Sequence, residues 1–192
     1  SNQNGYTAQV IGTFTSAPQI PESGIHGKVL SNGDSLRLGK VTDPTNSARK
    51  ALAFQVAPDD PKTSGSKRSE LKFNNNVELN KTYWVAVSVF IEDWGNLSSG
   101  DQALFGTQMH SGNNSLSLSP SFGIYTAGSN GRNLQVQTRY STSTSPSRSN
   151  SNTVRHAQYP IPFGRWVDFV IKFRHSIKSD GFLQAWMDGQ QI

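Results

Sequence analysis

The sequence predicts an all-β protein, an antiparallel β-sandwich or jelly roll. Short runs of alternating apolar and polar residues recur along its 192 residues, and Gly, Ser, Asn and Thr are abundant between them. No long stretch shows a clean 3.6-residue period. Many strands at short spacing, without helical spacers, are typical of an antiparallel sandwich and not of alternating strands and helices.

The expected elements follow in chain order. A hairpin over residues 28–39 would turn at Asn32-Gly33, a dipeptide that favours a tight reversal. Segment 141–153 is rich in Ser and Asn, lacks apolar residues, and is expected to be a mobile loop. Turns are expected at 178–181 and 188–189. The other expected strands cover residues 50–57, 69–73, 82–92, 103–110, 115–119, 122–128, 133–141, 165–176 and 181–192.

The chain is expected to form a single domain over residues 1–192, because this length suffices for one full core. Its last residues, 186–192, read as a strand, a turn and the start of another strand. Such an end would leave an unpaired sheet edge. We therefore expect C-terminal strands to be missing after residue 192, or a second polypeptide segment to complete the fold.

Charge and composition narrow the partners. The formal net charge of +5 favours a polyanion. The basic residues are scattered and form no nucleic-acid motif, and no apolar run could span a membrane, so neither partner is expected. There is no cysteine. Three glycosylation sequons, at Asn80, Asn96 and Asn113, favour a secreted, extracellular protein.

No cofactor or metal is expected. The acidic residues form no Asp-x-Asp-x-Asp-Gly loop, so a structural calcium has no supporting motif. The chain also lacks a Cys/His zinc set and a phosphate-binding glycine loop.

Two polar motifs in strand-like sequence are the candidate active site. They are Arg68-Ser69-Glu70-Leu71 and Gln108-Met109-His110. Alternation places Gln108 and His110 on one side of their strand. Removal of the C5 proton of a uronate requires its carboxylate to be neutralised, which Arg68 and Gln108 could do. His110 could accept the proton, and Glu70 could orient Arg68. An acidic polysaccharide is therefore the expected substrate.

At these residues the chain resembles a known group. The two motifs are similar to the Arg-(Thr/Ser)-Glu-Leu and Gln-Ile-His signatures of jelly-roll alginate lyases, which have a concanavalin A-like fold. Residues 164–192, GRWVDFVIKFRHSIKSDGFLQAWMDGQQI, resemble later strands of the wider family that includes heparin lyase I and fungal glucuronan lyase. The resemblance covers roughly residues 65–192 and implies that Arg68 and Gln108 neutralise the carboxylate and that His110 is the base or its partner.

One feature of that group is not found here. Its members carry a later strand, Tyr-x-Lys-x-Gly-x-Tyr, that supplies a tyrosine acid, and residues 1–192 contain no such motif. Either this tyrosine lies beyond residue 192 or the chain lacks it. Tyr140, with Arg139 beside it, is a candidate local substitute. The remaining candidate substrate-binding residues are Lys67, Lys72 and His26.

Three other classes compete with a lyase that acts by β-elimination. A carbohydrate-binding module or lectin would use aromatic platforms, although Trp84 and Trp166 are expected in the core because their neighbours alternate. A retaining glycoside hydrolase needs two carboxylates about 5 Å apart, and Glu92-Asp93 would face opposite sides of a strand. A nucleic-acid binder is disfavoured as above. His156 and His175 are expected at the surface.

Overall fold

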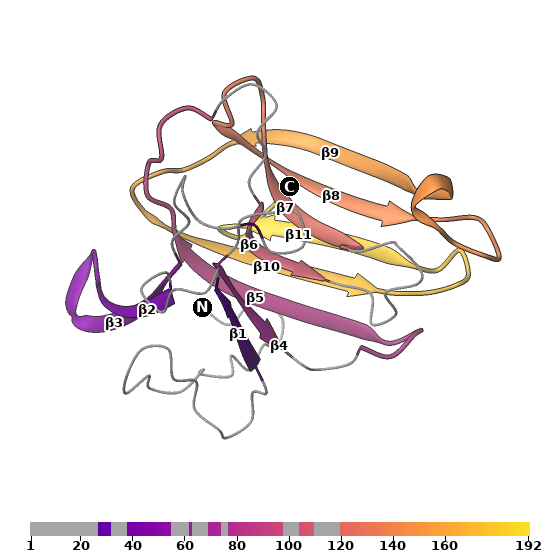
Figure 1. Ribbon diagram of the computed structural model, residues 1–192, viewed down its shortest axis with the longest axis horizontal. Helices are drawn as coiled ribbons and strands as arrows, with labels where there is room; N and C mark the ends of the chain where they lie inside the picture. Colours follow the sequence, from indigo (N-terminus) through magenta and orange to yellow (C-terminus); the bar gives the residue numbers. More distant parts are fainter. Residues whose placement is uncertain are drawn as a thin grey trace. The chain divides into compact units, whose positions relative to one another are not determined.

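The computed structural model describes residues 27–31, 38–54, 62, 69–73, 77–97, 104–109 and 120–192. This part of the chain is nearly all antiparallel strand, with one short 3-10 helix, Arg148–Asn150 (Figure 1). The predicted all-β class is confirmed. The chain divides into two compact units, Ser1–Asn76 and Val77–Ile192, which are described separately below.

The first unit contains two pairs of strands. β1 (Gly27–Ser31) pairs with β4 (Ser69–Phe73), and β2 (Leu38–Asp43) pairs with β3 (Asn46–Phe54). The predicted hairpin over 28–39 is therefore wrong. A turn dipeptide favours only a local reversal, whereas β1 finds its partner about forty residues later, in unbroken register with β4.

The reversal between β2 and β3 is stabilised by a buried aspartate. The backbone amide and the hydroxyl of Thr45 both donate to Asp43 Oδ1 at 2.8 Å, and Arg49 forms an ion pair with Asp43 Oδ2 at 2.8 Å. Asp43 is only 5% exposed, so these bonds compensate the burial of its charge. An Asx-type contact of this kind is a frequent way to close a hairpin.

The second unit consists of two four-stranded antiparallel sheets (Figure 1). One sheet has the order β12–β11–β10–β5 and the other the order β6–β7–β8–β9. The strands of the first are β5 (Thr82–Phe90), β10 (Trp166–Arg174), β11 (Phe182–Met187) and β12 (Gln190–Gln191). Those of the second are β6 (Leu104–Met109), β7 (Phe122–Ala127), β8 (Asn133–Tyr140) and β9 (Asn152–Pro160).

The two sheets pack face to face around one core. Alternate residues of β10 point inward and are almost fully buried. Opposite them lie apolar residues of β7 and β8, and the rings of Phe122 and Phe173 meet at 5.0 Å between centroids. The second unit is thus a β-sandwich. Among the residues whose burial is described, the buried apolar ones are Ile91, Phe122, Ile124, Leu134, Val136, Ile161, Val167, Phe169, Ile171, Phe173 and Ala185.

One strand, β9, was not predicted from the sequence. The expected loop over 141–153 ends at Ser151, and β9, which pattern analysis missed, begins at Asn152. Within the loop, the Ser141 hydroxyl donates to the Asn150 carbonyl at 3.0 Å, and Asn150 Nδ2 donates to the Ser145 carbonyl at 3.0 Å. The sequence pattern did not predict β9, because most of its side chains are exposed and polar and so show no apolar alternation.

The prediction that Trp84 belongs to the core is wrong. Trp84 is 39% exposed, and its neighbours Tyr83 and Val85 pack on the core instead. Trp166 is partly buried and packs edge-on against Phe90, outside the core cluster. Alternation indicates that a strand has two unlike faces, but when both faces carry apolar groups it does not say which one is covered.

His156 is exposed as expected, whereas His175, also expected at the surface, is only partly exposed. The His175 ring lies 5.1 Å from that of Phe173, and its Nε2 lies 3.2 Å from Ser121 Oγ. Burial lowers the pKa of His175, so the neutral imidazole is favoured. His175 therefore extends the edge of the core.

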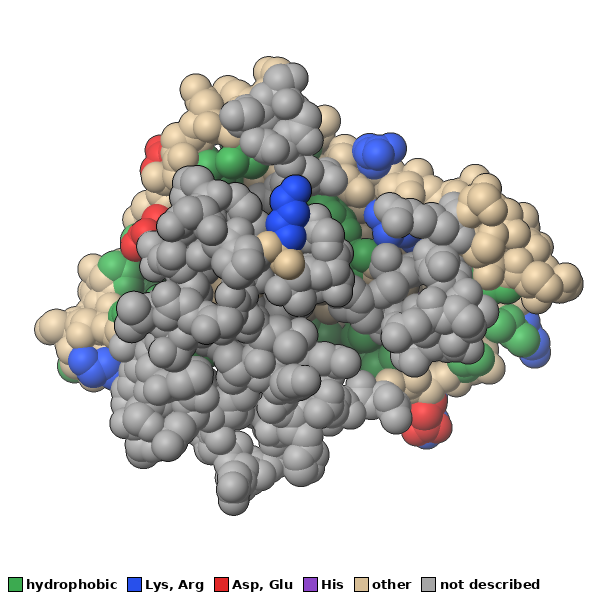
Figure 2. Space-filling view, in the orientation of Figure 1, with side chains coloured by type: hydrophobic (Ala, Val, Ile, Leu, Met, Phe, Trp, Pro, Cys, Tyr) green, Lys and Arg blue, Asp and Glu red, His purple; other side chains and the backbone are tan. Residues whose placement is uncertain are grey.

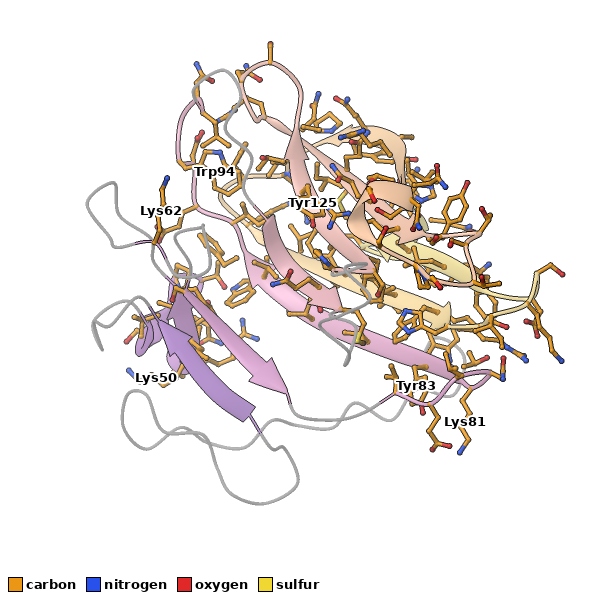
Figure 3. The ribbon with its side chains drawn as sticks, turned by 45° about the vertical axis from the view of Figure 1, so that its right-hand side comes forward. Lys50, Lys62, Lys81, Tyr83, Trp94 and Tyr125 are labelled. Carbon is orange, nitrogen blue, oxygen red and sulfur yellow. The ribbon has the colours of Figure 1, made fainter. Side chains whose placement is uncertain are left out.

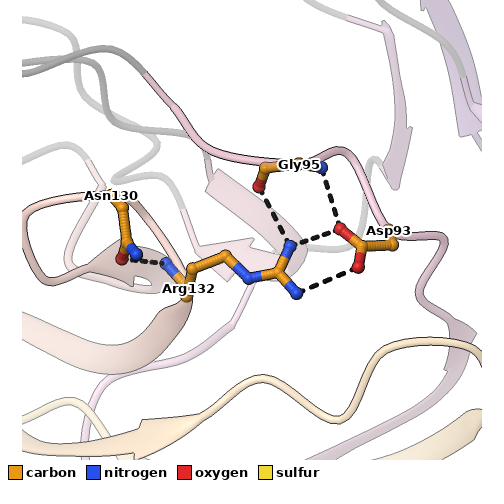
Figure 4. Close-up of polar contacts among 4 residues, drawn as sticks. All are labelled: Asp93, Gly95, Asn130 and Arg132. Carbon is orange, nitrogen blue, oxygen red and sulfur yellow. Dashed lines mark hydrogen bonds and ion pairs between the residues drawn. The ribbon is translucent and has the colours of Figure 1, made fainter.

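An ion pair joins the segment after β5 to the turn before β8 (Figure 4). Arg132 Nη2 donates to Asp93 Oδ2 at 2.9 Å, and Arg132 Nη1 donates to Asp93 Oδ1 and, at 3.0 Å, to the Gly95 carbonyl. The Gly95 amide donates to Asp93 Oδ1 at 2.8 Å, and Asn130 Oδ1 accepts from the Arg132 amide at 3.3 Å. The hydrogen bonds from Arg132 and Gly95 lower the pKa of Asp93 to about 2.

We expect Asp93→Asn to destabilise the protein at neutral pH and to have no such effect in strong acid. The pKa of Asp93 falls from 3.8 to about 2 on folding, so its contribution is complete above about pH 4 and is lost as the pH falls through about 2. Urea unfolding of both proteins across this range measures the difference. Glu92→Gln, at an exposed neighbour, is the control. A destabilisation that stays constant down to pH 2 would contradict this account.

Candidate functional site

A β-bulge in β6 directs Gln108 away from the core. Phe105 pairs with Ile124 and Gln108 pairs with Gly123, the preceding residue of β7. Two extra residues of β6 therefore lie between these pairs and form the bulge. Gly106 takes φ +74° within this bulge, a conformation that favours glycine. Met109 packs on the core, and its neighbour Gln108 consequently faces the other side of the sheet.

Gln108 belongs to a row of polar side chains that crosses the whole sheet. In register it pairs with Gly123, which pairs with Gln137, which pairs with Arg155. Across the sheet, the row therefore presents the amide of Gln108, no side chain at Gly123, the amide of Gln137 and the guanidinium of Arg155. One strand, β7, lies between those of Gln108 and Gln137, so their backbones are two inter-strand spacings, about 10 Å, apart. We call Gln108, Gly123, Gln137 and Arg155 the polar row.

Gln137 is the member of this row that sequence analysis missed. Its side chain is 5% exposed, and its Nε2 has no hydrogen-bond partner among the residues that the structure describes. A buried amide without a partner costs about 1–3 kcal/mol. The neighbouring Gln135, in contrast, donates from Nε2 to the His156 carbonyl at 2.6 Å. The available signal was the polar alternation Gln-x-Gln-x-Arg over 135–139.

Tyr125 and Arg139 lie on the same side of the sheet as the polar row. Tyr125 follows Gly123 by two residues on β7, and Arg139 follows Gln137 by two residues on β8. Burial raises the pKa of Tyr125, while the positive charge of Arg139 acts in the opposite direction. Tyr125 therefore carries a protonated hydroxyl at neutral pH. Figure 3 labels Tyr125 among the side chains of this sheet.

Tyr140 lies on the other side of β8. It alternates with Arg139, shares its side of the strand with Leu134 and Val136, and is 49% exposed at the strand end. The structure does not bring Tyr140 onto the face that carries Gln108. Its catalytic role stays a prediction, and Tyr125 is the tyrosine that shares the face of Gln108.

Most other candidate residues cannot be placed beside Gln108. Glu70 and Lys72 lie on β4 of the first unit, two residues apart, where they pair with Leu30 and Lys28. His26, Lys67, Arg68 and His110 lie outside the described residues. The roles expected for these six residues stay predictions.

The described residues form no metal cluster, and the face drawn in Figure 2 shows no concentrated basic patch. Among described residues, no three His, Cys, Asp or Glu side chains gather closely enough to hold a metal ion. Figure 2 shows the described Lys and Arg side chains as separate spots on the visible face. No helix among the described residues has the length and apolar character needed to cross a bilayer.

An antiparallel sandwich with a row of amide and guanidinium donors across one sheet face is suited to a polyhydroxylated, anionic ligand. The model of the polysaccharide lyase family matches residues 3–192, and the chain belongs to this family. It is accordingly an enzyme that cleaves polysaccharides. No curated protein and no solved structure matches the chain.

Proposed function

We propose that this lyase cleaves a uronate-containing polysaccharide, of the glucuronan, alginate or glycosaminoglycan type, by β-elimination. The polar row carries the proposal. Gln108 and Gln137 present amide groups on one sheet face, and the Gln137 nitrogen has no partner among the described residues. Because the Gln137 nitrogen is shielded from solvent, its side chain must rotate to meet a sugar carboxylate; a carboxylate that then accepts from both amides would satisfy that donor and would itself be stabilised.

The proposed reaction needs donors at the carboxylate, because the C5 proton is poorly acidic while the adjacent group keeps its full charge. As a base removes this proton, the electron pair of the C5–H bond forms the C4=C5 double bond. The bond from C4 to the glycosidic oxygen breaks, and that oxygen takes up a proton. Negative charge develops on the carboxylate oxygens in between, where preorganised donors lower the barrier.

We assign the base to His110 and the carboxylate donors to Gln108, Gln137 and Arg68. His110 and Arg68 rest on the sequence motifs and their resemblance. Gln137 rests on its place in the polar row. Tyr125 is the proposed source of the proton for the leaving oxygen, supported by its shared face and its raised pKa. Arg139 and Arg155 extend the positive charge along the polymer.

Ultraviolet absorbance tests this proposal, because elimination creates a double bond conjugated to a carboxylate, whereas hydrolysis and binding do not. The protein is mixed separately with alginate, glucuronan, heparin and hyaluronan. We expect absorbance to rise with at least one polymer and His110→Ala to abolish the rise. His156→Ala, at an exposed histidine on β9, is the matched control and should retain activity.

Two results would contradict the proposal. One is a flat trace with every uronate polymer. The other is cleavage measured by new reducing ends without any absorbance, since that would indicate hydrolysis.

A further inference from the structure

The outer face of the other sheet carries a group of three aromatic side chains and one lysine, all at least partly exposed. Trp84 on β5, Lys172 on β10, and Phe182 and Trp186 on β11 alternate with residues that pack on the core. Trp84 is 39% and Phe182 36% exposed. We call these four residues the aromatic patch. An exposed group of large aromatic rings on a sheet is a typical binding surface.

Two rings of the aromatic patch stack on each other, and Lys172 lies near the third. The indoles of Trp84 and Trp186 stack with centroids 5.7 Å apart and an interplanar angle of 24°. Lys172, which is paired in register with Trp84, places its Nζ 4.9 Å from the Trp84 ring and 5.7 Å from the Phe182 ring. Trp84 and Trp186, from the strands on either side of β10, are thus in contact, and the ammonium of Lys172 lies close to the aromatic rings.

Lys172 is the group in the patch that favours an anionic ligand. Arg174 forms an ion pair with Asp180 at 2.8 Å, and Arg165 forms one with Asp188 at 2.7 Å. Lys172 has no carboxylate partner among the described residues. Its charge is therefore available to a ligand. Asp168, an exposed carboxylate on the same outer face of β10, accepts a hydrogen bond from the Ser88 hydroxyl and forms no ion pair with a described residue.

This combination fits one kind of occupant. The C–H face of a pyranose ring is flat and apolar enough to stack on an indole, and its hydroxyls keep their contact with water. A carboxylate on the same sugar, or on the next one, could reach the ammonium of Lys172. A chain with repeated sugars and carboxylates would use both features at once.

We propose that the aromatic patch is a second, non-catalytic binding site for an acidic polysaccharide chain. The carboxylate part of this inference rests on the proposed function. The patch and the polar row both face away from the core, but they belong to opposite sheets of the sandwich. A ligand on the patch is therefore separate from one on the polar row. Binding at both sites would keep the polymer at high effective concentration near the enzyme.

Affinity electrophoresis in gels that contain alginate or glucuronan tests the proposal on the whole protein. We expect Trp84→Leu combined with Trp186→Leu to weaken retention by about tenfold. Lys172→Met keeps the aliphatic stem over Trp84 and should weaken retention in these gels but not in gels of carboxyl-reduced alginate. Trp94→Leu is the control, because this indole is 37% exposed and lies outside the patch.

Unchanged retention of the double variant or of Lys172→Met would overturn the proposal. So would an equal loss of retention in Trp94→Leu. A parent protein that the gels do not retain would also overturn it. A dimer in size-exclusion chromatography that the patch variants abolish, with retention unchanged, would also overturn it. Urea unfolding checks that each variant is folded, and Lys172→Met supplies the test if the double variant is not. Absorbance of the product reports the lyase reaction separately, so patch-dependent retention without absorbance would contradict only the proposed function.

Discussion

Replacing Gln108 by leucine should lower kcat on the uronate polymer by about 10²–10³-fold while KM changes little. This is the range seen when one preorganised donor to a developing oxyanion is removed. Gln108 faces away from the core on β6, in register with Gly123, so leucine can occupy its place without entering the sandwich. Initial rates of absorbance increase, measured over a range of polymer concentrations, separate kcat from KM.

The control for this variant is Gln190→Leu, which changes an exposed glutamine on β12 and should leave both constants unchanged. Gln137→Leu extends the test. If both amides bind one carboxylate, the loss in the double variant should differ from the product of the two single losses. Equal activity of Gln108→Leu and the parent would exclude Gln108 from the reaction, whatever the other residues do.

Phe173→Ala should lower the free energy of unfolding by about 3–5 kcal/mol. Phe173 is 1% exposed, and its ring lies 5.0 Å from Phe122, 5.9 Å from Tyr83 and 5.1 Å from His175. It therefore joins the two sheets, and alanine would leave a cavity between them. Because domains are stable by only about 5–15 kcal/mol in total, this one change removes a large fraction.

Urea unfolding measures this loss. Ile177→Ala is the control, since Ile177 is 84% exposed and its truncation should change stability by less than about 0.5 kcal/mol. Phe173→Leu should recover part of the loss because it refills much of the volume. A Phe173→Ala protein as stable as the parent would mean that the two sheets are not held together at this point.

Local pattern predicted most strands of the sandwich. The alternation in residues 165–176 and 181–192 was sufficient to place β10 and β11, and the turn at Asp188-Gly189 has the positive φ values, 51° and 81°, that a tight hairpin requires. Such features depend on residues close together in the chain, where side-chain direction and backbone preference act directly.

The sequence predicted less well which strands pair when they lie far apart in the chain. The Asn32-Gly33 signal predicted a hairpin, but β1 pairs with β4, because register depends on which distant strand offers a matching edge. β9 was missed because its exposed side chains leave no apolar pattern. Trp84 was placed in the core because alternation shows two faces without showing which one is covered.

The sequence by itself determined the all-β class; it also predicted Arg68 and Gln108 as site residues and an anionic polymer as the substrate. Only the tertiary structure placed Gln137 and Tyr125 on the face of Gln108 and Tyr140 on the other side of its strand. It also brought Trp84, Lys172 and Trp186 together. The physical reason is that these groupings come from hydrogen-bond register between strands far apart in the chain, which no single run of residues encodes.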